Sequence, residues 1–262
     1  MSSVMRLLGR GVAAGTVAGL LSGGFSWFLV EPLMDRAVRR EPAREVTGPP
    51  ADAGQHAEIF SRATQHAGLL VATTVTGLAL GLLFAVVHLL LHRRAPDTEA
   101  WRRALRLAAA GFTGVWLLPF VRYPSNPPGV GDPGTVGLRT QAWLGAIAIS
   151  LIGVVLAWAL HDHLARRGHG APARQLCVAG VLGAATAALF ALPDNPDALA
   201  VPAGELWDFR LWSVATALVL WAALGTAFGL LGERAARRSP RTAPHGGSVR
   251  VRTAPIEPPT LI

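Results

Sequence analysis

The sequence predicts an all-α fold, a polytopic transmembrane bundle of six helical spans built from three parallel-repeat hairpins with outer prolyl loops. Three observations lead to this prediction. Long runs lack Asp, Glu, Lys and Arg, the segments between them alternate in charge, and a proline-rich loop pattern recurs. A soluble domain would carry charges along its helices, whereas an ionised side chain at the centre of a bilayer costs at least ~2.5 kcal/mol.

Six uncharged stretches are the candidate spans. Five of them reach, or fall one residue short of, the roughly 20 residues that a helix needs to cross about 30 Å of hydrocarbon. The third has 15 residues, and we expect it to span because Arg106 and Arg122 at its two ends can extend into the two interfaces. The stretches are Gly11–Val30, Ala63–His92, Leu107–Val121, Thr140–His161, Gln175–Pro193 and Leu211–Gly232.

The charges between the spans predict the orientation. Segments 1–10, 93–106, 162–174 and 233–262 hold 16 Arg against 5 acidic residues, and the alternate segments hold 8 Arg against 11. Because cytoplasmic segments are enriched in basic residues, both termini are predicted to lie in the cytoplasm. The isoelectric point of 11.4 follows largely from this asymmetry, so the lipid bilayer is the expected partner and nucleic acid is not.

Composition also sets the domain organisation. Residues 1–235 form the predicted six-span membrane domain, and residues 236–262 form a basic tail without periodicity that we expect to be disordered and cytoplasmic. The single Cys177 excludes a disulfide framework within one chain. Phosphate-binding loops, nucleophile elbows and zinc-peptidase motifs are absent, so we predict no enzymatic activity and no permanently bound cofactor.

The loop pattern supplies the first candidate residues. Pro124-Ser125-Asn126-Pro127 follows the third span and Pro193-Asp194-Asn195-Pro196 follows the fifth, whereas Glu31-Pro32 ends the first. An arginine precedes each returning span. Because both the helix dipole and the outer face disfavour Arg there, at least two of the three should lie within salt-bridge distance of an acid, with Glu31, Asp132 and Asp208 as the preferred partners. The candidates are Glu31, Arg62, Arg139, Arg210, Asp132, Asn126, Asn195 and Asp208.

Two interpretations of these arginines remain open. In one, the ion pairs only fasten the loops onto the bundle; in the other, the acids form an outer vestibule that receives a cation. Glu31 is singled out because Pro32 disfavours helical geometry at the residue before it and should turn the carboxylate away from the helix axis.

Histidines supply candidate metal ligands. His88 and His92 lie four residues apart on one helix face at the predicted cytoplasmic end, where His161 and His163 also lie. On the outer side, His66 accompanies Glu31. Imidazole and carboxylate suit a divalent transition metal. The alternative is that histidines at helix ends sit at the interface and complement the helix dipole.

Glycines recur every four residues along the first span, at Gly11, Gly15, Gly19 and Gly23. Such spacing gives a smooth face on which another helix can pack closely. We expect this packing to occur within the bundle, with an oligomer interface as the alternative.

Several motifs together resemble those of the CbtA family, bacterial membrane proteins predicted to be cobalt-transport subunits. The resemblance covers about residues 5–238. Members often carry His beside the prolines after spans three and five, where Tyr123 and Asp194 stand here. The motifs are Phe28-Leu29-Val30-Glu31-Pro32, Gly131-Asp132-Pro133, Arg139-Thr140, Leu192-Pro193, Val201-Pro202-Ala203, Leu206, Phe209-Arg210 and Trp221.

The resemblance implies a location in the bacterial inner membrane, Co(II) as the substrate and a small His-bearing membrane partner subunit. Two functions are therefore weighed. One is an integral membrane subunit of a divalent-metal transport system without its own ATPase. The other is a non-conducting membrane scaffold that binds a partner through its outer loops.

Overall fold

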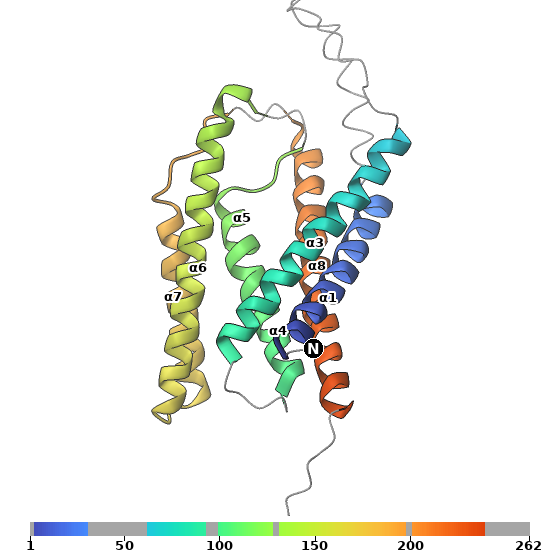
Figure 1. Ribbon diagram of the computed structural model, residues 1–262. Helices are drawn as coiled ribbons and strands as arrows, with labels where there is room; N and C mark the ends of the chain where they lie inside the picture. Colours follow the sequence, from blue (N-terminus) through green and yellow to red (C-terminus); the bar gives the residue numbers. More distant parts are fainter. Residues whose placement is uncertain (1–2, 31–61, 93–98, 128–130, 198–200, 239–262) are drawn as a thin grey trace, which may run out of the picture.

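The computed structural model describes residues 3–30, 62–92, 99–127, 131–197 and 201–238. Six helical segments in this part of the chain are long and apolar enough to cross a membrane, which confirms the predicted class. They run alternately up and down (Figure 1). The helices are α1 (Ser3–Phe25), α3 (Arg62–His92), α4 (Ala100–Gly111) continuing into α5 (Leu118–Arg122), α6 (Val136–Arg166), α7 (Ala171–Leu189) and α8 (Ala203–Arg238).

Helices α3, α6 and α8 begin at one end of the bundle, which we call the outer end after the predicted orientation (Figure 1). The described chain starts and finishes at the opposite, inner end. Most of the predicted tail lies outside the described residues, and residues 236–238 still belong to α8.

Short π-helical or 3-10 segments follow, join or precede the long helices. A π-helical segment η1 (Ser26–Val30) follows α1, a second π-helical segment η3 (Phe112–Leu117) joins α4 to α5, and the 3-10 turn η4 (Pro133–Thr135) precedes α6. Pro119 lies just after η3 and cannot donate a backbone hydrogen bond to the preceding turn. A wider π-helical turn before such a proline is a common adjustment.

The third span is longer than its uncharged run. The helix begins at Ala100 and continues through η3 to Arg122, so Arg102, Arg103 and Arg106 lie on its first turns. The prediction that this run belongs to a span is confirmed. The helix is longer than the run because an uncharged run marks only the apolar core, whereas a hydrogen-bonded helix can continue into the interface. For the same reason, Arg139 and Arg210 lie inside α6 and α8 and do not precede them.

Four spans form one closely packed unit, the four-helix body. Helix α1 packs along α3 and α8, and α4 packs on α8 (Figure 1). Glycines permit the contact between α1 and α3: a Cβ added to Gly15 would overlap the carbonyl oxygen of Gly77 and lie 2.9 Å from the Cα of Gly81. The large apolar core of this body is Ala14, Ala18, Phe84, Ala85, Ala104, Leu107, Ala108, Trp221, Leu224 and Phe228.

The other two spans form the α6–α7 hairpin. A short turn joins them, in which Gly168 has a φ of +78° and the amide of His169 donates to the carbonyl of Leu164 at 3.1 Å. This is a Schellman motif, which ends α6 and reverses the chain. The hairpin contacts the rest of the protein chiefly through η3 and α5. A smaller apolar core of Leu118, Ala146 and Leu189 lies at this junction.

The three-hairpin repeat is not confirmed. Helix α7 packs on α6, whereas α8 packs on α1 and α4, so spans five and six have different principal partners. The physical reason is the length of the connections. Only residues 167–170 separate α6 from α7, which makes these two helices antiparallel neighbours, whereas the longer segment 190–202 allows α8 to pack elsewhere.

Candidate functional site

A cavity of about 820 Å³ opens at the outer end between α5, the start of α6 and the start of α8. We call it the outer pocket. Its lining includes three arginines that come from three different helices, together with a carboxylate and three side-chain amides. The polar lining residues are Arg122, Tyr123, Asn126, Arg139, Gln141, Asp194, Asn195 and Arg210.

Arg122 joins the end of α5 to the end of α7. Its Nε donates to the carbonyl of Leu189 at 3.2 Å, and its Nη2 donates to the carbonyl of Leu192 at 2.6 Å and to Oδ1 of Asp194 at 2.7 Å. Carbonyls at a helix C-terminus lack intrahelical donors, so a guanidinium satisfies them well. From the sequence, Arg122 was expected only to lie at the membrane interface. The sequence did contain a signal for this contact, because Arg122 lies beside the first prolyl loop and Asp194 lies in the similar second one.

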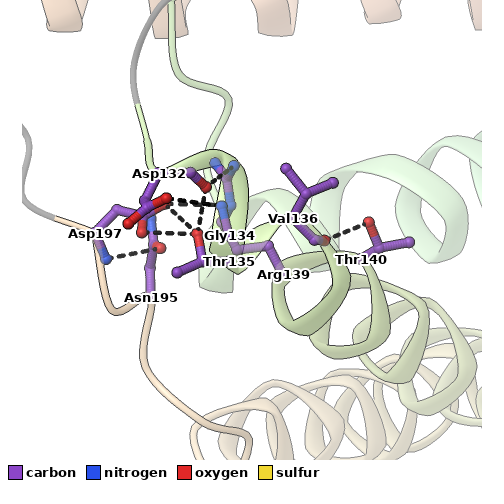
Figure 2. Close-up of polar contacts among 8 residues, drawn as sticks. All are labelled: Asp132, Gly134, Thr135, Val136, Arg139, Thr140, Asn195 and Asp197. Carbon is purple, nitrogen blue, oxygen red and sulfur yellow. Dashed lines mark hydrogen bonds and ion pairs between the residues drawn. The ribbon is translucent and has the colours of Figure 1, made fainter.

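Arg139 pairs with an acid, although not with Asp132. Its Nε lies 3.2 Å from Oδ2 of Asp197, whose side chain is only 4% exposed (Figure 2). Thr135 also donates to both oxygens of this carboxylate, at 2.8 and 3.1 Å. The amide of Asp197 in turn donates to Oδ1 of Asn195 at 3.2 Å. A network of four side chains therefore ties the α7–α8 connection to the start of α6.

Asp132 has a different role from the predicted one. Its carboxylate accepts a hydrogen bond from the amide of Gly134 at 2.7 Å, as expected for a residue that caps η4. Only its backbone carbonyl accepts from Arg139, at 3.3 Å. The preference for Asp132 as the ion-pair partner was thus wrong, because Pro133 at the first position of the turn favours capping by the preceding side chain.

Gly131 allows the network to close. Its φ is +111°, and a Cβ at this position would overlap Nη1 of Arg139 and lie 2.7 Å from Oδ2 of Asp197. Both the left-handed backbone and the close approach of the ion pair favour glycine here.

Arg210 is half-buried and bonds to neutral oxygens. Its Nε donates to the carbonyl of Ser125 at 3.4 Å, and its Nη2 donates to Oδ1 of Asn126 at 3.2 Å. These bonds join α8 to the prolyl loop after α5. Asp208, a predicted partner of the arginines, lies two residues earlier on α8 and is exposed.

The remaining outer candidates are only partly described. Glu31 lies outside the described residues. Arg62 is the first residue of α3 and His66 follows in its second turn, but their side chains are not among those that the structure describes. The expected contribution of Glu31, Arg62 and His66 to an outer site stays a prediction.

A second cavity, the inner pocket, has a volume of about 440 Å³ and lies among α3, α4, α6 and α7. It brings together His92, Glu99, His161 and Asp162. His161 Nδ1 lies 3.2 Å from Asp162 Oδ1, and His92 Nδ1 lies 3.1 Å from the backbone carbonyl of His88.

The other two predicted inner histidines do not line this cavity. His88 is buried, with its ring 5.1 Å from that of Phe228 and 4.6 Å from that of His92. His163 is exposed. Among the described residues, no three His, Cys, Asp or Glu side chains are grouped so that they could hold a metal ion. Binding of a metal at this end stays a prediction.

The outer pocket is lined by more positive than negative charge. Three guanidinium groups and one carboxylate face it, and a second carboxylate, that of Asp197, is held by Arg139. Asp194 is likewise held by Arg122. Both Asp194 and Asp197 are therefore already paired with arginine in this arrangement.

The fold defines a multi-pass helical membrane protein with a polar pocket towards each end of the bundle. Residues 4–233 match the CbtA family, described as a probable cobalt transporter subunit, and the chain belongs to this family. Comparisons with curated proteins and with solved structures gave no match.

Proposed function

We propose that this chain is the integral membrane subunit of a cobalt transport system in the bacterial cytoplasmic membrane, with both termini in the cytoplasm and no ATPase of its own. Membership of the CbtA family and the six-span bundle support this function. The excess of arginine in the segments at the inner end supports the orientation. If transport needs an energy source other than the concentration gradient of the metal, a partner subunit would supply it.

The observation that carries the proposal is one face of α6 that runs from the outer pocket to the inner pocket. Arg139 lines the outer pocket and His161 lines the inner pocket. The buried residues between them are three or four positions apart, so they share a helix face. They are Ala146, Ser150, Gly153 and Ala157.

Ser150 lies midway along this face and supports the proposed route. It is completely buried, and its hydroxyl has no hydrogen-bond partner among the described residues. A buried serine in a helix usually donates to the carbonyl four residues earlier. A hydroxyl without a partner at this depth costs roughly 1–3 kcal/mol, which is a reason to expect a polar ligand or water there in another state.

The barrier between the pockets would lie where η3 meets α6. A Cβ added to Gly114 in η3 would lie 3.2 Å from side-chain atoms of both Leu151 and Val154. In the described conformation this contact holds η3 against α6 beside the proposed route, whereas Gly153 on the route packs on Ala185 of α7. Because the α6–α7 hairpin contacts the rest of the protein chiefly through η3 and α5, we propose that movement of the hairpin opens the route.

Uptake of radiolabelled cobalt by cells with and without the chain tests the function, with nickel as the competing ion. Expression should raise cobalt accumulation, and Ser150→Leu should abolish the increase while the protein remains in the membrane. Equal accumulation with and without the chain would contradict a transport role.

The absence of a three-ligand metal site among the described residues favours the second candidate, a non-conducting scaffold. Purified chain in liposomes separates the two functions. A transport subunit should admit cobalt, alone or with its partner, whereas a scaffold should retain a partner through its outer loops and admit none.

A further inference from the structure

We propose that the outer pocket binds a polycarboxylate anion, either free or as the chelate of a divalent metal. The binding of the anion rests on the pocket alone, and only its role as a metal carrier rests on the proposed function.

The charge of the pocket favours an anion. Arg122, Arg139 and Arg210 line it from three helices, and the acids Asp194 and Asp197 are paired with the first two of these arginines. Even when both acids are counted, the charge is positive. A bare dication would be repelled by the guanidinium groups, and each of the two carboxylates nearby is already paired with one of them.

Arg210 supplies donors for this anion. A guanidinium carries five N–H donors in a planar fork, and the bonds to Ser125 and Asn126 use only two of them. The described partners of Arg210 are neutral oxygens, so its charge is not cancelled by them. Arginine binds carboxylates in pairs of parallel hydrogen bonds, which makes a carboxylate the matching group.

The amides and the volume indicate more than one carboxylate. Asn126, Gln141 and Asn195 line the same cavity, and amide groups can donate to carboxylate oxygens that no arginine reaches. A metal ion with six waters would occupy roughly 200 Å³ at the volume of liquid water. The cavity, at about 820 Å³, is several times larger and can hold an organic chelate.

Binding of citrate to the purified full-length chain, measured by calorimetry at constant ionic strength, tests the proposal. Citrate alone, citrate with an equivalent of Co(II), free Co(II) and inorganic phosphate are the four ligands. We expect citrate or its cobalt complex to bind, and Arg210→Gln to weaken that binding about tenfold or more because it removes charged donors. Arg166→Gln, at an exposed position at the inner end, is the matched control and should bind as the unaltered protein does.

The comparison of citrate with its cobalt complex distinguishes the two sources of the anion. Arg210→Lys keeps the charge but lacks the planar fork of guanidinium donors, so it should give an intermediate affinity for citrate. The role of Arg210 in anion binding is therefore tested by two variants. Absence of citrate binding in both forms, equal affinity in Arg210→Gln, or equally tight binding of phosphate would overturn the proposal. Citrate binding by a chain that transports no cobalt would leave this site in place and refute the proposed function.

Discussion

The four-helix body and the α6–α7 hairpin are held by different kinds of contact. In the body, glycines bring the backbones of α1 and α3 into direct contact, and a continuous apolar core joins α1, α3, α4 and α8. The hairpin has a smaller core at α5, and arginine bonds at the outer pocket add to it. Helix α7 is the least buried of the six candidate spans.

This difference indicates how a bundle can be stable and still move. Backbone contacts between glycines have no long side chains that could adopt another packing, so the body should behave as one rigid unit. Ion pairs and a narrow apolar contact can be exchanged for others at lower cost. Movement is therefore expected at the junction of the hairpin with η3 and α5.

The largest expected effect is at the glycine contact. Gly15→Leu would drive a side chain into the backbone of Gly77 and Gly81, and should destabilise the protein by roughly 3 kcal/mol or more. Gly183→Leu is the control, since nothing lies within 4 Å of its Cβ position. Thermal unfolding in detergent, followed by size-exclusion chromatography, would measure both. Equal stability of the two variants would contradict the close glycine packing of α1 on α3.

The next effect concerns the ion pair between Arg139 at the start of α6 and Asp197 in the α7–α8 connection. Asp197→Asn should lower the free energy of unfolding by about 2–3 kcal/mol, because the carboxylate is buried and Arg139 loses its charged partner. The side chain of Arg139 is 29% exposed, so solvent screening keeps the loss from being larger. Arg139→Gln in the same background should cost little more. Additive losses in this double-mutant cycle would show that the two side chains do not interact.

Gly131→Ala should have a smaller effect. An alanine at a φ of +111° costs about 1–2 kcal/mol, and its methyl group would displace the guanidinium of Arg139. Gly137→Ala is matched to it, since the Cβ position there is open. The melting temperature should fall for the first variant only, and a fall of equal size in both would contradict the role assigned to Gly131.

Ser150→Ala should have the smallest effect on stability and a clear effect on transport. Removing a buried hydroxyl that has no partner should be neutral or stabilising by less than about 1 kcal/mol. Cobalt uptake should nevertheless decrease, because the polar group midway along α6 is lost. Unchanged uptake together with unchanged abundance would exclude Ser150 from the route.

The six spans could be predicted because the cost of burying charge in a bilayer acts on every residue of a run. The ends of the helices could not. Arg102 and Arg103 continue the third helix beyond its apolar core, where charge no longer opposes helix formation. Hydropathy therefore locates a span more reliably than it locates the first residue of a helix.

Four polar residues of the outer pocket were among the candidates from the sequence, but their pairing was not predicted. Arg139 and Arg210 were singled out with Asn126 and Asn195, and all four line the pocket. The partner of Arg139 lies 58 positions away in the α7–α8 connection, and its proximity depends on how the spans pack. The repeated prolyl loops show which segments have similar sequences, but they do not predict which segments are in contact in the fold.

The most direct test is a disulfide across the junction of η3 and α6. The Cβ position of Gly114 lies 3.6 Å from the Cβ of Val154, within the range for a disulfide, and Cys177 can be replaced by serine. Ala104→Cys with Gly229→Cys, 3.3 Å apart by the same measure, places a control bond inside the four-helix body. Oxidation of Gly114→Cys/Val154→Cys should stop cobalt uptake, reduction should restore it, and the control should transport in both states. Full uptake by the oxidised, cross-linked protein would contradict a route that opens between α6 and η3.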